Sequence, residues 1–401
     1  MSSIHAALEI GTSKTVLAVG EATRSGRVKV SCHAEIPSTG VRKSQILDIS
    51  QASQSIRSVL QEIVRKQSEA GSSITIRNAF LVVSGQHVKV DPFIGSVPVE
   101  GGRVGEEAIN AVLRASRTMA LPRDRELLDV VEQDYVVDNL GAISSPNGMS
   151  GNILRLNTLQ IHADSNRIMN ARTAADAAHI EIREPLFAAT CAAEAVLEDY
   201  EKRNGALVLD VGGGSTGYAA YSDGMLVSAG VIGVGGDHVT NDIAHAFQTT
   251  NAQAEDMKIR ESRALVTREG DASRVVKVDA GESTLMDNRT VSRRALDTVV
   301  NARLAELFTV LRENLEDQDV LHRLHTGVVL TGGGSRLRDI DALASQMLGI
   351  SARYGRPIHI DGLEEVEYPP EFAAISGALL YAHRNYEEHS VLDGILGRFF
   401  R

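Results

Sequence analysis

The sequence predicts an α/β fold of two related lobes, and three observations support this. An apolar strand, a glycine turn and a second apolar strand occur at Ala6–Val19 and again at Ala206–Ala220, so one hairpin is duplicated. A third glycine turn follows the apolar segment Thr326–Thr331. At 401 residues, of which 43% are hydrophobic, the chain is also too long for one ordinary core and apolar enough for two.

The first hairpin begins a series of strands and helices. Beyond the turn at Ser25–Gly26, we expect a strand at Val28–Ala34 and a helix at Gln51–Ala70, which ends before Gly71. One face of that helix is apolar, with Ile56, Val59, Leu60, Ile63 and Val64. Between Ser84 and Ala163 the pattern changes, because glycine and proline interrupt shorter elements, and this predicts an inserted subdomain. Its expected elements are strands Lys89–Ile94, Leu127–Val137 and Asn152–His162 and a helix Glu106–Met119.

Regular alternation then resumes and leads through the second hairpin. The expected elements are helices Ala188–Tyr200, Asp237–Phe247 and Ala252–Leu265, a strand Arg274–Ala280 and a long helix Arg293–Leu315. The last strand enters Gly332–Gly334, and we expect this turn to open a helix at Leu337–Leu348.

The three glycine turns predict a polyphosphate site. Polyphosphate needs several backbone N–H groups at close range, and glycine lets the chain fold into such a concavity. Gly11–Lys14 and Gly212–Thr216 would form two facing cradles, and Gly332–Gly334 at a helix N-terminus would suit the nucleotide end of the ligand. No P-loop motif occurs, and neither hairpin turn opens a helix as dinucleotide folds require.

Composition excludes other classes. The formal net charge of -11 argues against nucleic acid as a partner, because that binding needs clustered Lys and Arg. Neither a signal peptide nor an apolar run long enough to span a membrane is present, which predicts a cytoplasmic protein. Cys32 and Cys191 lack the spacing of a disulfide frame or a zinc site, so we expect small core residues.

The order of the glycine turns resembles the actin-like ATPase superfamily, whose two ribonuclease-H-like lobes close on ATP. Within it, the chain resembles the FtsA family over about residues 1–384. The insert carries two of the matching stretches and replaces the usual actin small subdomain, as in that family. The stretches are Ile10–Lys14, Val83–His87, Leu128–Asp138, Gly148–Gly151, Gly235–Asp242, Ala254–Lys258 and Val329–Gly334.

The resemblance implies a domain organisation with an ATP cleft between two lobes. It gives a first large subdomain (1–83, 164–200 and 362–384), the insert (84–163), a second large subdomain (201–238 and 303–361), a small subdomain (239–302) and a linker with a C-terminal helix (385–401).

The resemblance also implies ATP and Mg²⁺ as cofactors. By position, the phosphates would contact Gly11, Thr12, Ser13 and Lys14 from one side and Gly212, Gly213, Gly214, Ser215 and Thr216 from the other. The nucleoside would contact Gly236, Glu255, Lys258, Gly333, Gly334 and Ser335. A simple surface ion pair is the alternative for Glu255 and Lys258, which are three residues apart on one helix face.

Two departures from the family pattern predict slow ATP hydrolysis at most. The family usually has Asp where this chain has Glu9 and Gly217. Asp210 and Glu184 remain as candidate catalytic acids, and Glu9 and Asp210 would hold Mg²⁺ through water. We therefore expect nucleotide to act as a conformational switch, and whether the chain is an enzyme stays open.

The partners implied by the resemblance are the C-terminal peptide of FtsZ, other copies of the chain in filaments, and further division proteins at the insert. Arg303 and Arg294 are the candidate contacts for the acidic peptide. A solvated helix with an intrahelical pair to Glu306 is the alternative.

The C-terminus has an amphipathic pattern. At about 100° per residue, one half of the helical wheel is apolar, with Val391, Leu392, Ile395, Leu396, Phe399 and Phe400. We expect a peripheral anchor on the cytoplasmic face of the inner membrane, aided by Arg398 and Arg401, or else a tail that packs on its own core.

Three functions follow from these observations: an adapter that ties the FtsZ ring to the membrane, a pilus-assembly scaffold of related fold, and an ATP-hydrolysing enzyme such as a sugar kinase or chaperone.

Overall fold

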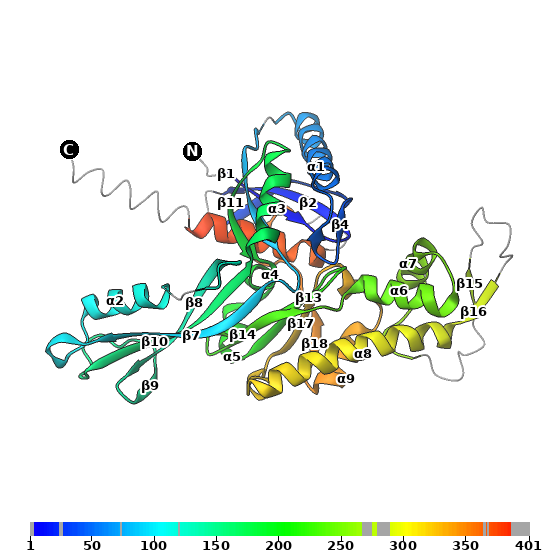
Figure 1. The fold of residues 1–401 in the computed structure, drawn as a ribbon. Coiled ribbons are helices and arrows are strands. Elements are labelled where there is room, and N and C mark those ends of the chain that lie inside the picture. Colours follow the sequence, from blue (N-terminus) through cyan, green and yellow to red (C-terminus); the bar gives the residue numbers. More distant parts are fainter. Residues whose placement is uncertain are drawn as a thin grey trace.

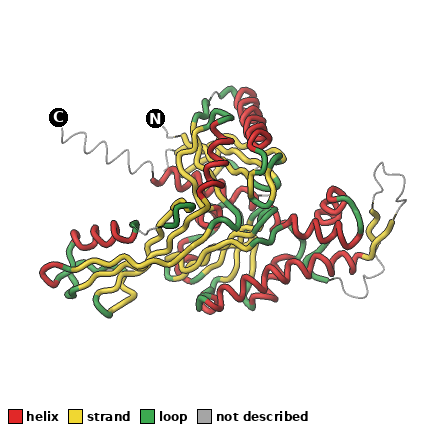
Figure 2. The backbone as a smooth tube through the Cα atoms, viewed as in Figure 1, coloured by secondary structure: helices red, strands yellow, loops and turns green. Residues whose placement is uncertain are grey.

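The computed structural model describes residues 4–23, 27–72, 74–118, 121–266, 275–278, 289–363, 366 and 369–385. Two large sheets lie at the centre, and two arms extend from them to opposite sides (Figure 1). One arm is made mainly of long strands and the other mainly of helices (Figure 2). This is the two-lobed α/β architecture that the sequence predicts.

The first lobe is built on an antiparallel hairpin whose apolar strands are buried. Strands β1 (Ile4–Ile10), β2 (Lys14–Ala22) and β3 (Val28–Pro37) pair in sequence, and β6 (Asn78–Val83) and β11 (Glu181–Phe187) add in parallel on the β1 side. The sheet order is β11-β6-β1-β2-β3-β19, where β19 is Ile360–Asp361.

Two helices contact this first sheet. Helix α1 (Ile49–Glu69) begins at Asp48, whose carboxylate accepts the backbone N–H of Gln51, and buries one apolar face. Helix α3 (Ser165–Asp176) begins at Asp164, which caps it in the same way.

The second lobe repeats this connectivity. Strands β12 (Ala206–Val211), β13 (Thr216–Ser222) and β14 (Met225–Ile232) are antiparallel, and β17 (Gly327–Thr331) and β18 (Ala352–Tyr354) follow in parallel. The order is β14-β13-β12-β17-β18. Each lobe thus has three antiparallel strands followed by parallel ones, which confirms the duplication.

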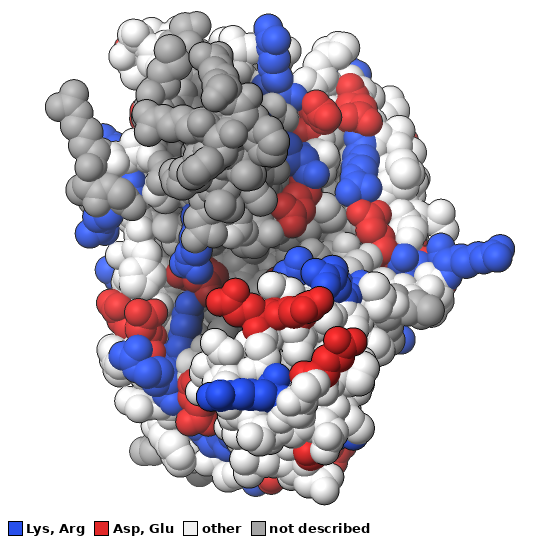
Figure 3. All heavy atoms as spheres, turned by 90° about the vertical axis from the view of Figure 1, so that its left-hand side faces the viewer, with Lys and Arg blue, Asp and Glu red and all other residues white. Residues whose placement is uncertain are grey.

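The insert forms the strand-rich arm. Its sheet has the order β7-β10-β8-β9, from β7 (Lys89–Pro98), β10 (Ile153–Asp164), β8 (Arg125–Val137) and β9 (Leu140–Ile143). Helix α2 (Glu106–Ser116) packs on one face around a separate small core that includes Val112, Leu154 and Leu156. Seen from the end of this arm, acidic and basic side chains are interspersed over the surface (Figure 3).

The helical arm extends the second lobe. It contains α6 (Gly236–Phe247), α7 (Asn251–Arg260), a two-stranded sheet of β15 (Val275–Val278) and β16 (Arg289–Ser292), and the first part of α8 (Arg293–Asp317). Helix α8 runs from the tip of this arm back to the second lobe (Figure 1).

Two helices connect the lobes and touch closely. Helix α4 (Ala188–Val196) leads from β11 toward the second lobe, and the last described helix covers residues 373–385. A Cβ atom added at Gly377 would lie only 1.7 Å from the carbonyl oxygen of Cys191, so the helix at 373–385 approaches α4 backbone to backbone. Cys191 is buried, as expected for a small core residue, and Cys32 is partly buried with a free thiol.

Several predicted elements were wrong in extent. The expected helix Ala188–Tyr200 is divided into α4 and α5 (Asp199–Asn204), because the chain is extended at Leu197 and Glu198. Helix α7 ends at Arg260.

The turn Gly332–Gly334 does not open an α-helix, which corrects the expectation above. A short 3-10 turn, η4 (Gly333–Arg336), follows it, and α9 (Ile340–Leu348) begins only after Asp339, whose backbone is left-handed with φ 64°.

Within the described ranges, no helix has the length and apolarity needed to cross a bilayer. The amphipathic stretch 391–400 lies outside the described residues.

Candidate functional site

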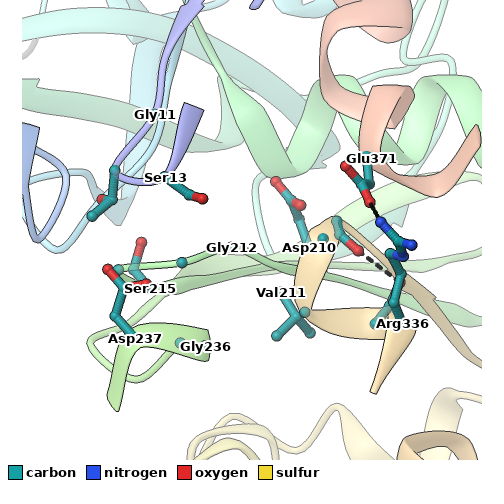
Figure 4. Close-up of a pocket in the computed structure, with 18 of the residues that line it drawn as sticks. Gly11, Ser13, Asp210, Val211, Gly212, Ser215, Gly236, Asp237, Arg336 and Glu371 are labelled. Atoms are coloured by element: carbon teal, nitrogen blue, oxygen red, sulfur yellow. Dashed lines mark hydrogen bonds and ion pairs between the residues drawn. The ribbon is translucent and has the colours of Figure 1, made fainter. Parts of the chain in front are cut away.

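The three glycine turns meet around one cavity between the lobes. The cavity has a volume of about 800 Å³, which is within the range of small-molecule sites. Figure 4 shows the first turn opposite the second. The third turn packs against Asp210 and Val211, because a Cβ added at Gly332 or Gly334 would lie 2.4 Å from an atom of one of them. Predicted site residues that line the cavity are Glu9, Gly11, Thr12, Ser13, Lys14, Asp210, Gly212, Gly213, Gly214, Ser215, Gly236, Glu255, Lys258, Gly333, Gly334 and Ser335.

The two hairpin turns have the same internal geometry. The N–H of Gly11 donates to the carbonyl of Lys14 at 3.0 Å, and the N–H of Gly212 donates to the carbonyl of Ser215 at 3.0 Å. The tip of the second turn lies against the first lobe. A Cβ added at Gly214 would lie 2.6 Å from Oγ1 of Thr12, so this position requires glycine.

Two acids occupy equivalent positions near the ends of the first strands of the two lobes. Burial, and then the nearby charge of Asp210, raise the pKa of Glu9 to about 8. Burial raises the pKa of Asp210 to about 6. Gly332, with φ 78°, passes so close that a Cβ there would lie 2.4 Å from Oδ1 of Asp210. The cavity therefore holds two carboxyl groups that resist ionising together.

A divalent cation fits such a pair, because its charge would stabilise both ionised carboxylates. Among the residues that the structure describes, no group of three or more His, Cys, Asp or Glu side chains is arranged to hold a metal ion. Water and ligand oxygens would therefore have to complete the coordination.

Lys14 joins the first hairpin to the segment before the helix at 373–385. Its Nζ lies 2.6 Å from Oε2 of Glu35 and also contacts Oε2 of Glu371. The other oxygen of Glu371, Oε1, accepts from Arg336 at 2.7 Å, a contact drawn in Figure 4. Glu371 lies in the 3-10 turn η5 (Pro369–Phe372). One carboxylate thus holds cations from both lobes.

The N-terminus of α6 packs against the second glycine turn. The N–H groups of Gly236 and Asp237 donate to the carbonyls of Gly212 and Gly213 at 2.9 and 2.8 Å. Burial raises the pKa of Asp237, whose side chain faces the cavity. The start of α6 is therefore fixed beside the second glycine turn, at the wall of the cavity.

Glu255 and Lys258 form an ion pair, with Nζ 2.7 Å from Oε2. The pair lines the cavity, and Lys258 is only 12% exposed and also donates to the carbonyl of Gly236 at 3.2 Å. The pair is thus part of the cavity wall, where a nucleoside could reach it.

Other predicted residues do not join the cavity lining. Thr216 is buried and its hydroxyl donates to the carbonyl of Val234 at 2.8 Å. Glu184 lies in strand β11, before α4 begins, and it accepts from the hydroxyl of Tyr381 at 2.9 Å. It is absent from the lining of the cavity. Burial raises the pKa of Glu184.

The two predicted peptide contacts lie on α8. Arg303 is bound to both carboxylate oxygens of Asp242, at 2.6 and 3.1 Å, and to Glu306 at 2.5 Å, so the intrahelical pair of the alternative interpretation is present. Arg294 is exposed at the start of the helix.

Sequence reasoning missed several residues of the cavity: Ser44, Ser84, Asp237, Arg336, Tyr354 and Glu371. Ser84 and Asp237 lie in stretches already noted for their resemblance, and Arg336 directly follows the third glycine turn and Ser335, so these three were within reach. Ser44, Tyr354 and Glu371 lie outside the glycine turns and the matching stretches.

Comparisons with known proteins agree with this architecture. A family model described as "Cell division protein FtsA" matches residues 207–377, and one described as "SHS2 domain inserted in FTSA" matches residues 85–162.

Two similar sequences are named "Cell division protein FtsA". That of Pseudomonas aeruginosa is 33% identical over 374 residues, which cover 93% of this chain and 88% of the relative. That of Escherichia coli (strain K12) is 29% identical over 386 residues, which cover 94% and 90%.

Solved structures with low identity share the fold. A PilM–PilN type IV pilus biogenesis complex matches with a TM-score of 0.63 at 20% identity, covering 94% of this chain and 98% of the other. MreB5 of Spiroplasma citri bound to AMPPNP matches with a TM-score of 0.53 at 14% identity, covering 98% of both. The fold is therefore actin-like with an inserted subdomain, and the chain belongs to the FtsA family of cell division proteins.

Proposed function

We propose that this chain is an ATP-binding, self-assembling adapter that links the FtsZ ring to the cytoplasmic face of the membrane during cell division. The observation that carries the proposal is the cavity at which two equivalent glycine hairpins meet, with Glu255 and Lys258 on its wall. Family membership supplies the division context. The domain boundaries expected from the sequence, including the insert at 84–163, belong to this proposal.

ATP would lie with its phosphates between the turns Gly11–Lys14 and Gly212–Ser215 and its nucleoside toward Glu255, Lys258 and Gly333–Ser335. Glu9 and Asp210 would hold Mg²⁺ through water, and the cation would neutralise phosphate charge. The raised pKa values of this acid pair support the assignment.

Hydrolysis would be slow. Gly217 pairs with Asp210 across the second hairpin and lines the cavity without a side chain. A Cβ there would lie 3.1 Å from Cβ of Ala189, so α4 takes up the space into which a larger side chain would extend. With no carboxylate at this position and Glu184 outside the lining, the chain lacks two groups that would orient an attacking water, which favours a nucleotide switch over an enzyme.

The peptide of FtsZ would bind beside α8 through Arg303 and Arg294. Because Asp242 and Glu306 already hold Arg303, an acidic peptide would compete with them for the guanidinium group. We also assign filament formation to this chain, recruitment of further division proteins to the insert, and membrane attachment to the amphipathic stretch 391–400.

Calorimetric titration of the full chain with Mg²⁺–ATP tests the nucleotide site. Wild type should bind, and Gly214→Val should not, because the added side chain would push against Thr12. A control, Gly141→Val, adds the same atoms to an exposed strand of the insert. Lack of binding by wild type would refute the nucleotide role.

Binding of the FtsZ tail peptide, followed by fluorescence anisotropy, tests the partner. Arg303→Ala should weaken it, whereas Arg312→Ala, which removes an arginine paired to Glu316 on the same helix, should not. Equal binding by both variants would argue against Arg303.

Vesicle co-sedimentation of the full chain and of a version that ends at Glu388 tests the membrane anchor. Equal sedimentation of the two would exclude the C-terminal stretch as the anchor.

A further inference from the structure

A small hairpin of the first lobe reaches the phosphate end of the cavity. Strands β4 (Val41–Arg42) and β5 (Gln45–Ile46) pair in antiparallel register and are joined by Lys43 and Ser44. Both joining residues have left-handed backbones, with φ 50° and 55°. Two-residue turns of this kind strongly favour Asn-Gly, Asp-Gly or Gly-Gly, so Lys and Ser are unfavourable residues here.

The tip of this hairpin contacts both glycine turns. The N–H of Ser44 donates to Oγ1 of Thr12 at 2.8 Å, and the Ser44 hydroxyl lies 3.4 Å from Oγ1 of Thr12 and 3.4 Å from Oγ of Ser215. A Cβ on Gly214 would lie 3.0 Å from Cα of Lys43. Hydroxyl groups from the first turn, the tip and the second turn therefore stand in a row across the cleft.

A phosphate group bound beside this row of hydroxyl groups would need hydrogen-bond donors other than the ammonium group of Lys14. The ammonium group of Lys14 is already held by Glu35 and Glu371. Ser44 lines the cavity, and a serine hydroxyl can rotate to donate to an anion while still accepting from a neighbour. An unfavourable turn at a candidate binding site points to a role for its side chain there.

We propose that the β4–β5 tip is a further part of the phosphate site, in which the hydroxyl of Ser44 donates to the terminal phosphate of ATP beside Thr12 and Ser215. This assignment rests on the proposed nucleotide function. Since Thr12 and Ser44 belong to the first lobe and Ser215 to the second, a terminal phosphate bound to all three would hold the lobes together at this end of the cleft. A nucleoside diphosphate lacks that phosphate and would leave Ser44 without this contact.

Titration calorimetry of the full chain with Mg²⁺–ATP and with Mg²⁺–ADP tests the assignment. Ser44→Ala removes the hydroxyl and keeps the turn, so we expect about tenfold weaker ATP binding, the usual effect of one hydrogen bond to a charged group, with ADP changed less than twofold. Ser50→Ala, at an exposed position early in α1, is the matched control and should bind both nucleotides like wild type.

A double variant, Lys43→Asn with Ser44→Gly, separates the hydroxyl from the backbone. It gives the turn its favoured residues, so the apo chain should unfold at a higher temperature, yet ATP binding should be as weak as in Ser44→Ala. The assignment would be overturned if either variant bound ATP with an affinity within twofold of wild type. It would also be overturned if the variants lost affinity for ATP and ADP equally. If wild type binds neither nucleotide, the proposed nucleotide function itself fails.

Discussion

Replacing Glu9 by Gln exchanges a buried acid for a neutral amide of nearly the same shape, and the change should make the protein more stable at alkaline pH. Burial and the charge of Asp210 raise the pKa of Glu9 from 4.5 to about 8. Well below pH 4.5 the carboxyl is protonated in both the folded and the unfolded chain, so it adds no pH dependence there. As pH rises toward 8, the unfolded chain ionises first, and the folded state loses stability relative to it.

The size of this loss follows from the pKa shift. One pKa unit corresponds to 1.36 kcal/mol, so a shift from 4.5 to about 8 sets an upper limit of roughly 5 kcal/mol, fully developed only above pH 8. Because the carboxyl faces an open cavity, we expect about 2–4 kcal/mol. Asp210, with a folded-state pKa of about 6, adds its own pH dependence to the stability. The Glu9→Gln variant retains Asp210 and therefore retains this contribution.

Urea unfolding at pH 5, 7 and 9 in the presence of a chelator measures the effect. The unfolding midpoint of wild type should fall below that of Glu9→Gln as pH rises, with the two close together at pH 5. Added Mg²⁺ should raise the midpoint of wild type at pH 9 more than that of the variant, because the cation would stabilise the ionised pair. Glu100→Gln, at an exposed position on the insert, should follow wild type throughout. Parallel midpoints of wild type and Glu9→Gln over this pH range would refute the reasoning.

Two further substitutions test the packing around α4. Gly217→Asp should raise the ATP turnover only in combination with Ala189→Gly, which makes room for the new Cβ. A phosphate-release assay measures this turnover. A double variant that is no faster than Ala189→Gly alone would contradict the prediction. Gly377→Ala should lower the Tm by several degrees, because its methyl group would overlap the carbonyl of Cys191. Gly141→Ala is the control, because a Cβ there would make only an ordinary van der Waals contact, and this variant should melt like wild type. Equal Tm values for the two variants would show that the helix at 373–385 can shift to make room.

The fold was predictable because its signals are local. Each hairpin needs only an apolar strand, a turn and another apolar strand, and the duplicated pattern implied the duplicated lobe. The break between α4 and α5 was missed, since no glycine or proline marks it. There the backbone N–H of Glu198 donates to the side chain of Glu201, which in turn binds Arg353 of β18. Such a contact depends on the tertiary fold, and helix periodicity does not reveal it.

The part of the cavity lining that the glycine turns form could be predicted from the sequence. The part that side chains from distant segments form could not. Gly11 and Gly212 are visible as turns in the sequence. Glu371 contacts Lys14 across 357 positions of the chain, and no local pattern connects them. Ser44 was missed for a related reason, because a lysine–serine pair does not predict a left-handed turn.

The shared strand order of the two lobes bears on how the acid pair arose. Glu9 and Asp210 occupy matching places, one before the last residue of the first strand in each sheet. If one ancestral half carried an acid at that place, copying the half and closing the copies face to face would bring two negative charges together at once. A cation bound there would then be shared evenly by the two halves, because each contributes one acid from the same place in its sheet.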